Sequence, residues 1–346
     1  MAEKPLSVAI VGMGKMGLSH AAMLSVLAPG SLTALVEAQN AGHPTLRSLG
    51  LRMPIYDDAE SLLAAHAVDA AIICTPTFTH TGLTKTFLER GVSVLVEKPL
   101  TESFAKSSEL AELAMKKGAI AAVGYSIDYD PVFRKARELL RAGVIGRPLK
   151  YGAWLEHAEV LGPKRGWLFQ KAKSGGGVVI NPAPHLLYLM LDAFGFPKRL
   201  CANLRSVWTE VEDEASVELE YESGLKGLFK ASWSVPEKPA LELSLFVEGE
   251  HGTLAASDDD VLLELNRPSG NFSTGTHRLH RGELEKEADG FELAPAAHAA
   301  NYFRQDKEFL DCVRAKAQPR NSFANTLQVD RLIDAIYRSK DGAWTS

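Results

Sequence analysis

The chain has 346 residues, of which 46% are hydrophobic and 23% carry a charge. This length allows two ordinary domains with their own cores, and this composition excludes a disordered or a fibrous protein. The formal net charge is −5, and acidic and basic residues are mixed without a basic block, so we expect no nucleic-acid partner.

The first third of the chain alternates short apolar runs with amphipathic stretches. We predict strands at residues 7–11, 32–37, 68–74, 92–97 and 119–124, and helices at residues 16–28, 79–90 and 102–117. Strands that alternate with helices form a parallel sheet with right-handed crossovers. We therefore expect residues 1–124 to form an α/β domain.

The rest of the chain has a different pattern. A helix is predicted after Asp130 and Pro131, with Gly143 as its stop signal. Apolar and polar residues then alternate in the runs 215–221, 225–233, 241–248 and 261–265, which is typical of an antiparallel sheet with one solvated or partner-covered face. Residues 266–295 are predicted to be a loop, and two helices are predicted at 297–315 and 323–339. We therefore expect residues 125–346 to form an α+β domain, whose last helices can pack back on the first domain.

The three cysteines, Cys74, Cys201 and Cys312, are far apart and odd in number. This favours reduced thiols over a disulfide framework or a zinc site. The N-terminus lacks the features of a signal peptide, and the apolar runs are too short to span a membrane. We expect a cytoplasmic protein without a membrane partner.

A glycine motif follows the first predicted strand and opens the first predicted helix. It contains Gly12, Gly14 and Gly17 in the spacing G-x-G-x-x-G, with Lys15 and Met16 between the last two. The first glycine permits a tight turn, the second lets the backbone approach a pyrophosphate, and the third allows close packing of helix on strand. The motif and its context predict a dinucleotide site at a helix N-terminus.

Glu37 lies 20 residues after Gly17, at the end of the second predicted strand. An acid in this place accepts hydrogen bonds from the ribose hydroxyls and repels a 2′-phosphate. No arginine follows it that would receive such a phosphate. The sequence therefore favours NAD over NADP as the cofactor.

Several further motifs resemble the glucose-fructose oxidoreductase, inositol dehydrogenase and MocA family (Gfo/Idh/MocA). They are the opening run VAIVGMGKMGLSH from Val8, the Thr75-Pro76 pair with His80, the run GVSVLVEKP from Gly91, the triplet Val123-Gly124-Tyr125, and Ile145-Gly146-Arg147-Pro148. The resemblance covers nearly the whole chain. It implies a Rossmann domain followed by a domain with a large open antiparallel sheet that often mediates oligomerisation, so we expect a homo-oligomer, either a dimer or a tetramer.

The resemblance also implies roles in the first domain. The cofactor would be bound by Thr75, Pro76, His80, Glu97 and Lys98, together with the glycine motif and Glu37. Lys98 would meet both the nicotinamide ribose and a substrate hydroxyl, where an ammonium stabilises a developing alkoxide. Glu97 would position the turn, and Pro99 would be held against the cofactor in a strained or a cis linkage. The family acts mostly on sugars, cyclitols and sugar nucleotides.

In the second domain, the glycine run 175–177 is followed by Asn181 and then by His185. The resemblance places His185 where a histidine takes the hydroxyl proton as hydride leaves the same carbon. The usual aspartate is Asn181 here, and the aspartate usual after the histidine is Tyr188. Because the site has lost carboxylates, the family's catalytic set is not transferred as a whole. Two alternatives follow: catalysis rests on Lys98 and His185, which we assign as the catalytic residues, or the reaction has changed.

Further residues are candidates for contact with substrate. We expect Asn181, Tyr125, Trp167 and Tyr188 to bind it, and Trp154, Glu156, His157, Lys164 and Arg165 are additional polar or aromatic candidates. His277 and His280 are spaced as a pair but lack a clear third ligand, so no metal site is expected.

Three functions remain open. The leading hypothesis is an NAD-dependent oxidoreductase that acts on a CH–OH group of a sugar, cyclitol or sugar-nucleotide-like substrate. The second is redox-neutral glycoside cleavage or a lyase reaction that uses transient oxidation, with a tyrosine or histidine base; Tyr188 motivates it. The third is a non-catalytic dinucleotide-binding regulatory protein, which Asn181 motivates and which the retained Lys98 and His185 oppose.

Overall fold

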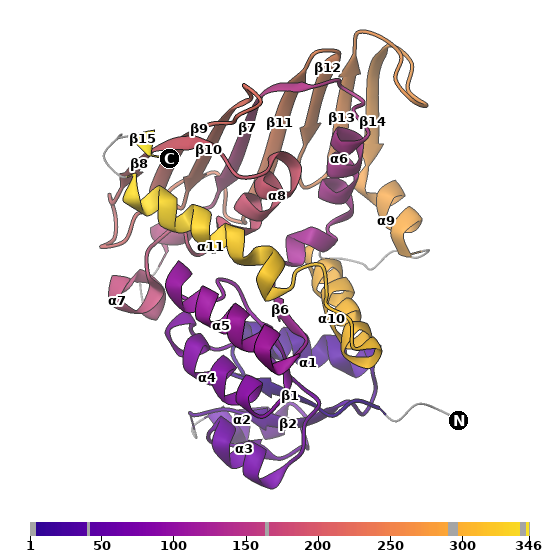
Figure 1. Cartoon of the computed structure of the whole chain (residues 1–346). Helices are drawn as coiled ribbons and strands as arrows, with labels where there is room; N and C mark the ends of the chain where they lie inside the picture. The colour runs from indigo at the N-terminus through magenta and orange to yellow at the C-terminus, as the bar shows by residue number, and fades with distance from the viewer. Residues whose placement is uncertain (1–4, 40–41, 163–165, 290–296, 340–343, 346) are drawn as a thin grey trace. The chain divides into compact units, whose positions relative to one another are not determined.

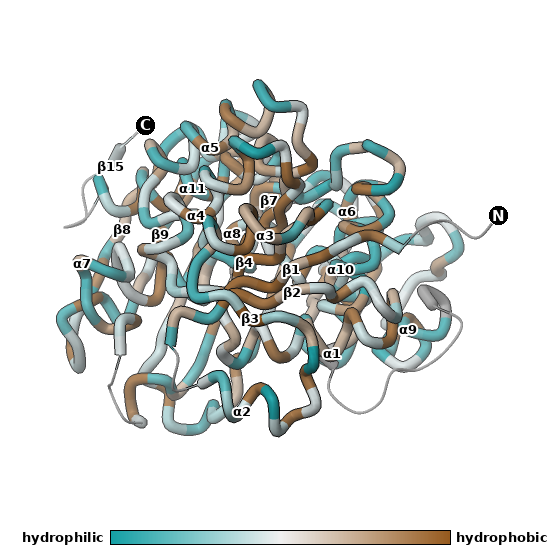
Figure 2. Tube along the Cα trace, turned by 90° about the horizontal axis from the view of Figure 1, so that it is seen from below, coloured by the Kyte–Doolittle hydropathy of each residue, from teal (hydrophilic) through white to brown (hydrophobic). Residues whose placement is uncertain are grey.

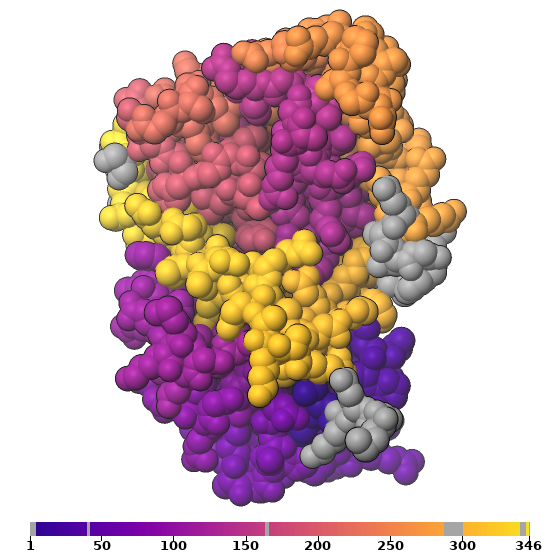
Figure 3. Space-filling view, turned by 45° about the vertical axis from the view of Figure 1, so that its right-hand side comes forward, coloured from indigo at the N-terminus to yellow at the C-terminus, as the bar shows by residue number. Residues whose placement is uncertain are grey.

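The computed structural model describes residues 5–39, 42–162, 166–289, 297–339 and 344–345 (Figure 1). The described residues form two compact units. The first takes those up to Tyr125 together with Tyr302–Leu327, and the second takes those of Ser126–Asn301 and those from Gln328 onward. In Figure 3 the yellow residues of the segment 302–327 lie against the purple residues of the first unit. Across the described ranges, no helix is long and apolar enough to cross a lipid bilayer.

The first unit contains a parallel sheet. Its strands, in chain order, are β1 (Val8–Val11), β2 (Leu32–Val36), β3 (Ile55–Tyr56), β4 (Ala70–Ile73), β5 (Ser93–Val96) and β6 (Ala121–Val123). Their order among the described residues is β3-β2-β1-β4-β5-β6, with every pairing parallel. This is the order of a doubly wound dinucleotide-binding fold, so the predicted Rossmann domain is confirmed.

Burial on both faces explains the uninterrupted apolar strands of this sheet. β1, β4 and β5 are buried at every position, and Figure 2 shows β1, β2 and β4 as a hydrophobic centre. The helices that connect the strands are α1 (Lys15–Leu27), α2 (His43–Ser48), α3 (Ala59–Ala65), α4 (Thr77–Glu89) and α5 (Phe104–Lys117). α5 ends as predicted at Gly118, whose φ of 63° suits the left-handed C-cap.

The second unit contains a large, mostly antiparallel sheet. Its strands are β7 (Pro148–Glu156), β8 (Arg199–Arg205), β9 (Glu214–Glu220), β10 (Lys226–Ser232), β11 (Glu242–Gly249), β12 (Gly252–Ala256), β13 (Asp260–Leu265), β14 (Gly275–His280) and β15 (Trp344–Thr345). The described strands run in the order β14-β13-β12-β11-β7-β10-β9-β8-β15, and only β7 and β10 pair in parallel among them. The predicted open sheet is thus confirmed.

Helices cover one face of this sheet. α8 (Pro184–Phe194) packs on β7, and α6 (Pro131–Arg141) packs on β12 and β13 (Figure 1). α6 begins as predicted, because the Asp130 carboxylate accepts the N–H groups of Val132 and Phe133 and Pro131 occupies the first turn. Short helices η2 (Ser126–Tyr129), η3 (Glu159–Leu161), η4 (Trp167–Phe169) and α7 (Lys171–Ser174) lie in the connections, and α10 (Ala297–Ala315) and α11 (Phe323–Arg338) follow near the C-terminus.

The loop predicted for residues 266–295 is wrong over part of its length. β14 and the helix α9 (Arg281–Asp289) occupy its middle, and residues 290–295 lie outside the described residues. β14 is an edge strand of polar residues that are exposed or half-buried, so it lacks the apolar alternation that identifies a half-buried strand. Backbone pairing with β13 holds it in the sheet, and the histidine pair His277 and His280 lies on this strand.

Candidate functional site

The glycine motif forms the turn between β1 and α1. Gly12 has a φ of +88°, and a Cβ there would lie 2.7 Å from the side chain of Thr75. A Cβ on Gly17 would lie 2.0 Å from the Gly12 carbonyl oxygen, whereas Gly14 faces open space. No side chain caps α1 at Gly14, so its first-turn N–H groups and positive dipole end remain available to an anion. This geometry fits a pyrophosphate.

Glu37 follows β2 and turns its carboxylate toward the glycine motif. One oxygen accepts the Met13 N–H at 2.9 Å, and the other accepts the Gln39 N–H at 2.9 Å. The side chain is half-buried, so part of it faces solvent. A carboxylate that two backbone donors fix in this way fits the ribose-binding acid expected from the sequence.

Replacing Glu37 by glutamine is expected to weaken the preference for NAD over NADP by about 10- to 100-fold, since charge-assisted hydrogen bonds to the ribose are lost and repulsion of a 2′-phosphate disappears. Dissociation constants for both dinucleotides, measured by fluorescence titration, would show this. Asp57→Asn, an exposed acid nearby, is the control and should retain the wild-type ratio. An unchanged ratio in Glu37→Gln would contradict the assignment.

The loop after β4 carries Thr75 and Pro76, both half-buried beside Gly12. His80, on α4, is buried, and its ring nitrogens lie 2.8 Å from the Thr75 carbonyl oxygen and 3.0 Å from that of Pro99. Burial lowers the pKa of His80. Since the ring contacts backbone of both loops, we propose that His80 holds the Thr75 loop against the Lys98-Pro99 turn.

The turn after β5 carries Glu97 and Lys98 and contains a cis peptide bond between Lys98 and Pro99. Glu97 is buried and Lys98 is half-buried. Burial lowers the pKa of Lys98, and the neighbouring Glu97 carboxylate opposes this shift. The carboxyl ends of β1, β4 and β5 therefore bring the glycine motif, Thr75 and Lys98 to one edge of the first unit's sheet, which is the edge where such sheets bind ligands.

In the second unit, His185 lies on the first turn of α8, as predicted. Pro184 begins the helix, and the His185 side chain is buried. Four residues before it, the Asn181 amide nitrogen donates to the carbonyl oxygens of Gly176 and Gly177 at 3.2 and 3.3 Å. An ionised aspartate has no N–H to donate to these two oxygens. The local backbone therefore suits the asparagine that replaces the family's acid.

Glu212 fixes the glycine run that precedes Asn181. Its carboxylate accepts the N–H of Gly177 at 2.8 Å, that of Val179 at 3.2 Å and the Tyr337 hydroxyl at 2.7 Å. Burial raises the pKa of Glu212. The sequence did not predict Glu212 and Tyr337 as site residues, because they lie far from the glycine run along the chain and belong to no local motif.

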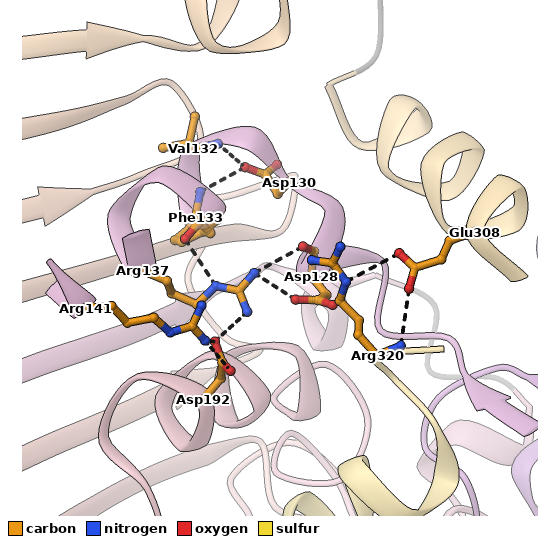
Figure 4. Close-up of polar contacts among 9 residues, drawn as sticks. All are labelled: Asp128, Asp130, Val132, Phe133, Arg137, Arg141, Asp192, Glu308 and Arg320. Carbon is orange, nitrogen blue, oxygen red and sulfur yellow. Dashed lines mark hydrogen bonds and ion pairs between the residues drawn. The ribbon is translucent and has the colours of Figure 1, made fainter. Parts of the chain in front are cut away.

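Tyr188 lies one turn after His185 and joins a buried ion-pair network. Its hydroxyl is hydrogen-bonded to Asp128, and burial, with the Asp128 charge as a further cause, raises the pKa of Tyr188. Arg137 lies 2.8 Å from the Asp128 carboxylate and 2.7 Å from that of Asp192 (Figure 4). The network ties η2 and α6 to the helix that carries His185.

Other predicted contact residues are distributed over both units. Tyr125 is fully buried at the end of the first unit, and Trp167 is half-buried in η4. Trp154 alternates along β7 with Tyr151, which stacks on Phe194 of α8 at 4.3 Å. Because neighbouring strand residues point to opposite faces, Trp154 lies on the face away from α8 and His185. Lys164 and Arg165 lie outside the described residues.

These features define a dinucleotide-binding oxidoreductase fold with a substrate-binding α+β unit. The family model described as "Oxidoreductase family, NAD-binding Rossmann fold" matches residues 6–125, and the model of the "GFO/IDH/MocA C-terminal domain" matches residues 133–255. The chain belongs to the Gfo/Idh/MocA family, and NAD is the cofactor that its Rossmann fold binds.

Two known relatives are similar to this chain over most of their length. The chain is 27% identical to scyllo-inositol 2-dehydrogenase (NAD(+)) of Bacillus subtilis over 92% of its own residues and 89% of the relative's. It is 24% identical to D-apiose dehydrogenase of Paraburkholderia graminis over 96% of its own residues and 86% of that relative's. Both relatives therefore span both units of this chain.

Solved structures share the fold. GenD2 from gentamicin A biosynthesis, in complex with NAD, is 26% identical, with a TM-score of 0.81 over 100% of this chain and 97% of that one. Levoglucosan dehydrogenase in complex with NADH and levoglucosan is 20% identical, with a TM-score of 0.86 over 99% of both chains. The latter likeness concerns the fold alone.

Proposed function

We propose that the protein oxidises a secondary alcohol, or reduces the corresponding ketone, on a sugar, cyclitol or sugar-nucleotide-like substrate. The observation that carries this proposal is the half-buried Lys98 with a lowered pKa, at the same sheet edge as the glycine motif and the Thr75 loop. Inositol and apiose dehydrogenases among the relatives support the substrate class. When bound, the nicotinamide accepts or gives the hydride.

Two side chains carry the proton chemistry in this proposal. Lys98 donates a hydrogen bond from its ammonium to the substrate oxygen as that oxygen gains alkoxide character. His185 accepts the hydroxyl proton during oxidation and returns it during reduction, which suits an imidazole at neutral pH. Asn181 orients the glycine-run backbone beside His185 and takes no proton.

Absorbance at 340 nm tests the proposal, with NAD and a panel of sugars, cyclitols, sugar acids and nucleotide sugars. A rise with one class is expected, and His185→Asn should lower its rate by about 100-fold or more. His280→Asn, an exposed histidine on β14, should retain the wild-type rate. Equal rates in the two variants would remove His185 from the mechanism, and no rise with any compound would refute the proposal.

The redox-neutral alternative depends on a base that removes a proton next to the transiently oxidised carbon. Tyr188 is a poor candidate, because burial raises its pKa and its hydroxyl already contacts Asp128. A phenol with a raised pKa is almost entirely protonated at neutral pH. We therefore favour net oxidation or reduction, and glycoside release without NADH formation in the same tubes would reverse this preference.

We also propose that the uncovered face of the large sheet pairs with a second copy. Leu228 and the half-exposed Phe246 line one groove with Trp154, and Lys226 and Glu218 also line it. A surface that combines apolar side chains with both charge signs can be self-complementary about a two-fold axis.

Replacing both Leu228 and Phe246 by glutamate is therefore expected to halve the mass in solution, or to reduce a tetramer to dimers, in light scattering after size exclusion. Met115→Glu introduces one glutamate at an exposed site on α5 and should keep the wild-type mass. A wild-type mass in the double variant would exclude this face as the interface.

A further inference from the structure

A buried polar cluster lies in the first unit beside the turn that carries Lys98. His20 on α1 and Asp306 on α10 have no exposed surface, and Glu97 at the end of β5 is 6% exposed. The glycine motif, the Thr75 loop and the proposed proton chemistry make no use of His20 or Asp306. Ionisable groups are seldom buried so completely unless a partner compensates for the loss of water.

Hydrogen bonds join the three side chains in a row. His20 Nδ1 lies 2.8 Å from Asp306 Oδ2, and His20 Nε2 lies 3.2 Å from Glu97 Oε1. Ionised carboxylates only accept hydrogen bonds, so between two of them both ring nitrogens donate and the ring is an imidazolium. Burial opposes this charge, yet Asp306 raises the pKa of His20 well above its usual value. Burial raises the pKa of Asp306, and the charge of His20 opposes this shift.

Two uncharged side chains, those of Cys74 and Tyr302, also face His20. The Cys74 thiol is hydrogen-bonded to it, and burial raises the pKa of that thiol. The ring of Tyr302 meets the imidazole edge-on, with centroids 5.8 Å apart. The cluster therefore places one positive charge between two carboxylates.

Glu97 connects this cluster to Lys98. Its second carboxylate oxygen accepts the backbone N–H of Lys98 at 3.2 Å. Gly124 packs against the same side chain, since a Cβ there would lie 3.1 Å from the Glu97 carboxyl carbon. The Glu97 carboxylate is thus held from one side by His20 and touches the Lys98 backbone on the other.

We propose that His20 and Asp306 are positioning residues for Lys98. Asp306 holds the imidazolium of His20, and the imidazolium holds the Glu97 carboxylate. Glu97 in turn fixes the backbone turn at Lys98 and places its own negative charge next to the Lys98 ammonium. This inference rests on the proposed role of Lys98 in the reaction. Glu97 lies 77 positions and Asp306 lies 286 positions after His20 along the chain. The proposal gives the three residues one task, the positioning of Lys98, and His20 contributes to it from the helix that the glycine motif opens.

Competitive acetylation tests the proposal without a substrate. Traces of acetic anhydride modify the intact protein at pH 8, and peptide mass spectrometry compares the rate at Lys98 with that at the exposed Lys85. A change of half a unit in the pKa of an amine changes its reactive fraction about threefold. His20→Asn and Asp306→Asn are each expected to change the relative rate at Lys98 by at least this factor.

The double variant separates a connected row from two independent contributions. If Asp306 acts through His20, adding Asp306→Asn to His20→Asn changes the rate no further, whereas independent effects would multiply. Leu24→Ala, a cavity in the same helix, controls for destabilisation and should leave the relative rate within about twofold. If His20→Asn fails to fold, the proposal is tested by the relative acetylation rate at Lys98 in the near-isosteric variant Asp306→Asn, compared with the rate in Leu24→Ala.

Single variants that match Leu24→Ala, or effects that multiply in the double variant, would overturn the proposal. The 340 nm assay is read separately on the same proteins. If the wild type oxidises no compound but the variants change the acetylation rate at Lys98 as expected, the proposed function is refuted and the positioning role stands. If the wild type turns over a substrate but the variants leave the acetylation rate at Lys98 unchanged, the positioning role alone is refuted.

Discussion

Replacing Lys98 by methionine is expected to reduce kcat by about 100- to 1000-fold, which is the usual cost of one donor to a developing oxyanion. Methionine keeps the length of the apolar stem and removes the ammonium. Binding of NAD should weaken by no more than about tenfold, since one hydrogen bond to the ribose is lost. Stopped-flow absorbance for the hydride step and fluorescence titration for the cofactor would measure the two effects separately.

Lys85→Met, on the exposed side of α4, is the matched control and should leave both values unchanged. Lys98→Arg keeps the charge but replaces a compact ammonium by a planar guanidinium, so we expect it to restore little activity. A fall in NAD binding that accounts for the whole loss of kcat/KM would show that Lys98 serves the cofactor and not the substrate oxygen.

The rate is also expected to depend on pH through Lys98. The ammonium is the active form in this proposal, and burial lowers its pKa from the ordinary value of 10.5. Activity should therefore fall as the pH rises through a value below 10.5, and this basic limb should be absent from Lys98→Met. A basic limb that survives in the variant would belong to another group.

Loss of Arg137 is expected to cost the largest amount of stability, about 3–5 kcal/mol, because it leaves the buried Asp128 carboxylate without its cation. Arg137 is 4% exposed and pairs with both Asp128 and Asp192. Urea unfolding of Arg137→Met, followed by tryptophan fluorescence and circular dichroism, would measure the change.

Arg141→Ala offers a matched control, since it pairs with the same Asp192 at 2.6 Å but is 59% exposed. An exposed ion pair contributes about 1 kcal/mol or less, so this variant should unfold near the wild-type urea concentration. If both variants lose the same free energy of unfolding, burial does not make the ion pairs of Arg137 contribute more than the exposed one. Because the network anchors the helix of His185, we expect Arg137→Met to lower kcat as well.

Local patterns predicted much of the fold correctly. The strands of the parallel sheet are buried on both faces and therefore read as continuous apolar runs, and capping at Asp130 and Gly118 set helix ends that the structure confirms. β14 escaped prediction because an exposed edge strand has no apolar face. Its place in the sheet depends on hydrogen bonds to β13, which composition does not record.

The candidate site shows the same division. The glycine motif, Glu37 and the Lys98 turn lie within short motifs, so their chemistry was visible in the sequence. Asp306 meets His20 across 286 residues and Tyr337 meets Glu212 across 125. Such contacts arise only when the chain closes on itself, and a single sequence offers no periodicity or spacing that reports them.

The interrupted first unit has a consequence for how the protein is made. Residues up to Tyr125 leave the ribosome long before Tyr302–Leu327, with a delay on the order of 10 to 30 s at ordinary rates of synthesis. Until then Val123 lacks the Asn321 amide that bonds to its carbonyl oxygen, and His20 stays without Asp306. Throughout this interval the nascent Rossmann segment therefore carries His20 with Glu97 but without Asp306, and its sheet has an uncovered edge. The cofactor unit is therefore completed only after residues 126–301 of the second unit have been synthesised.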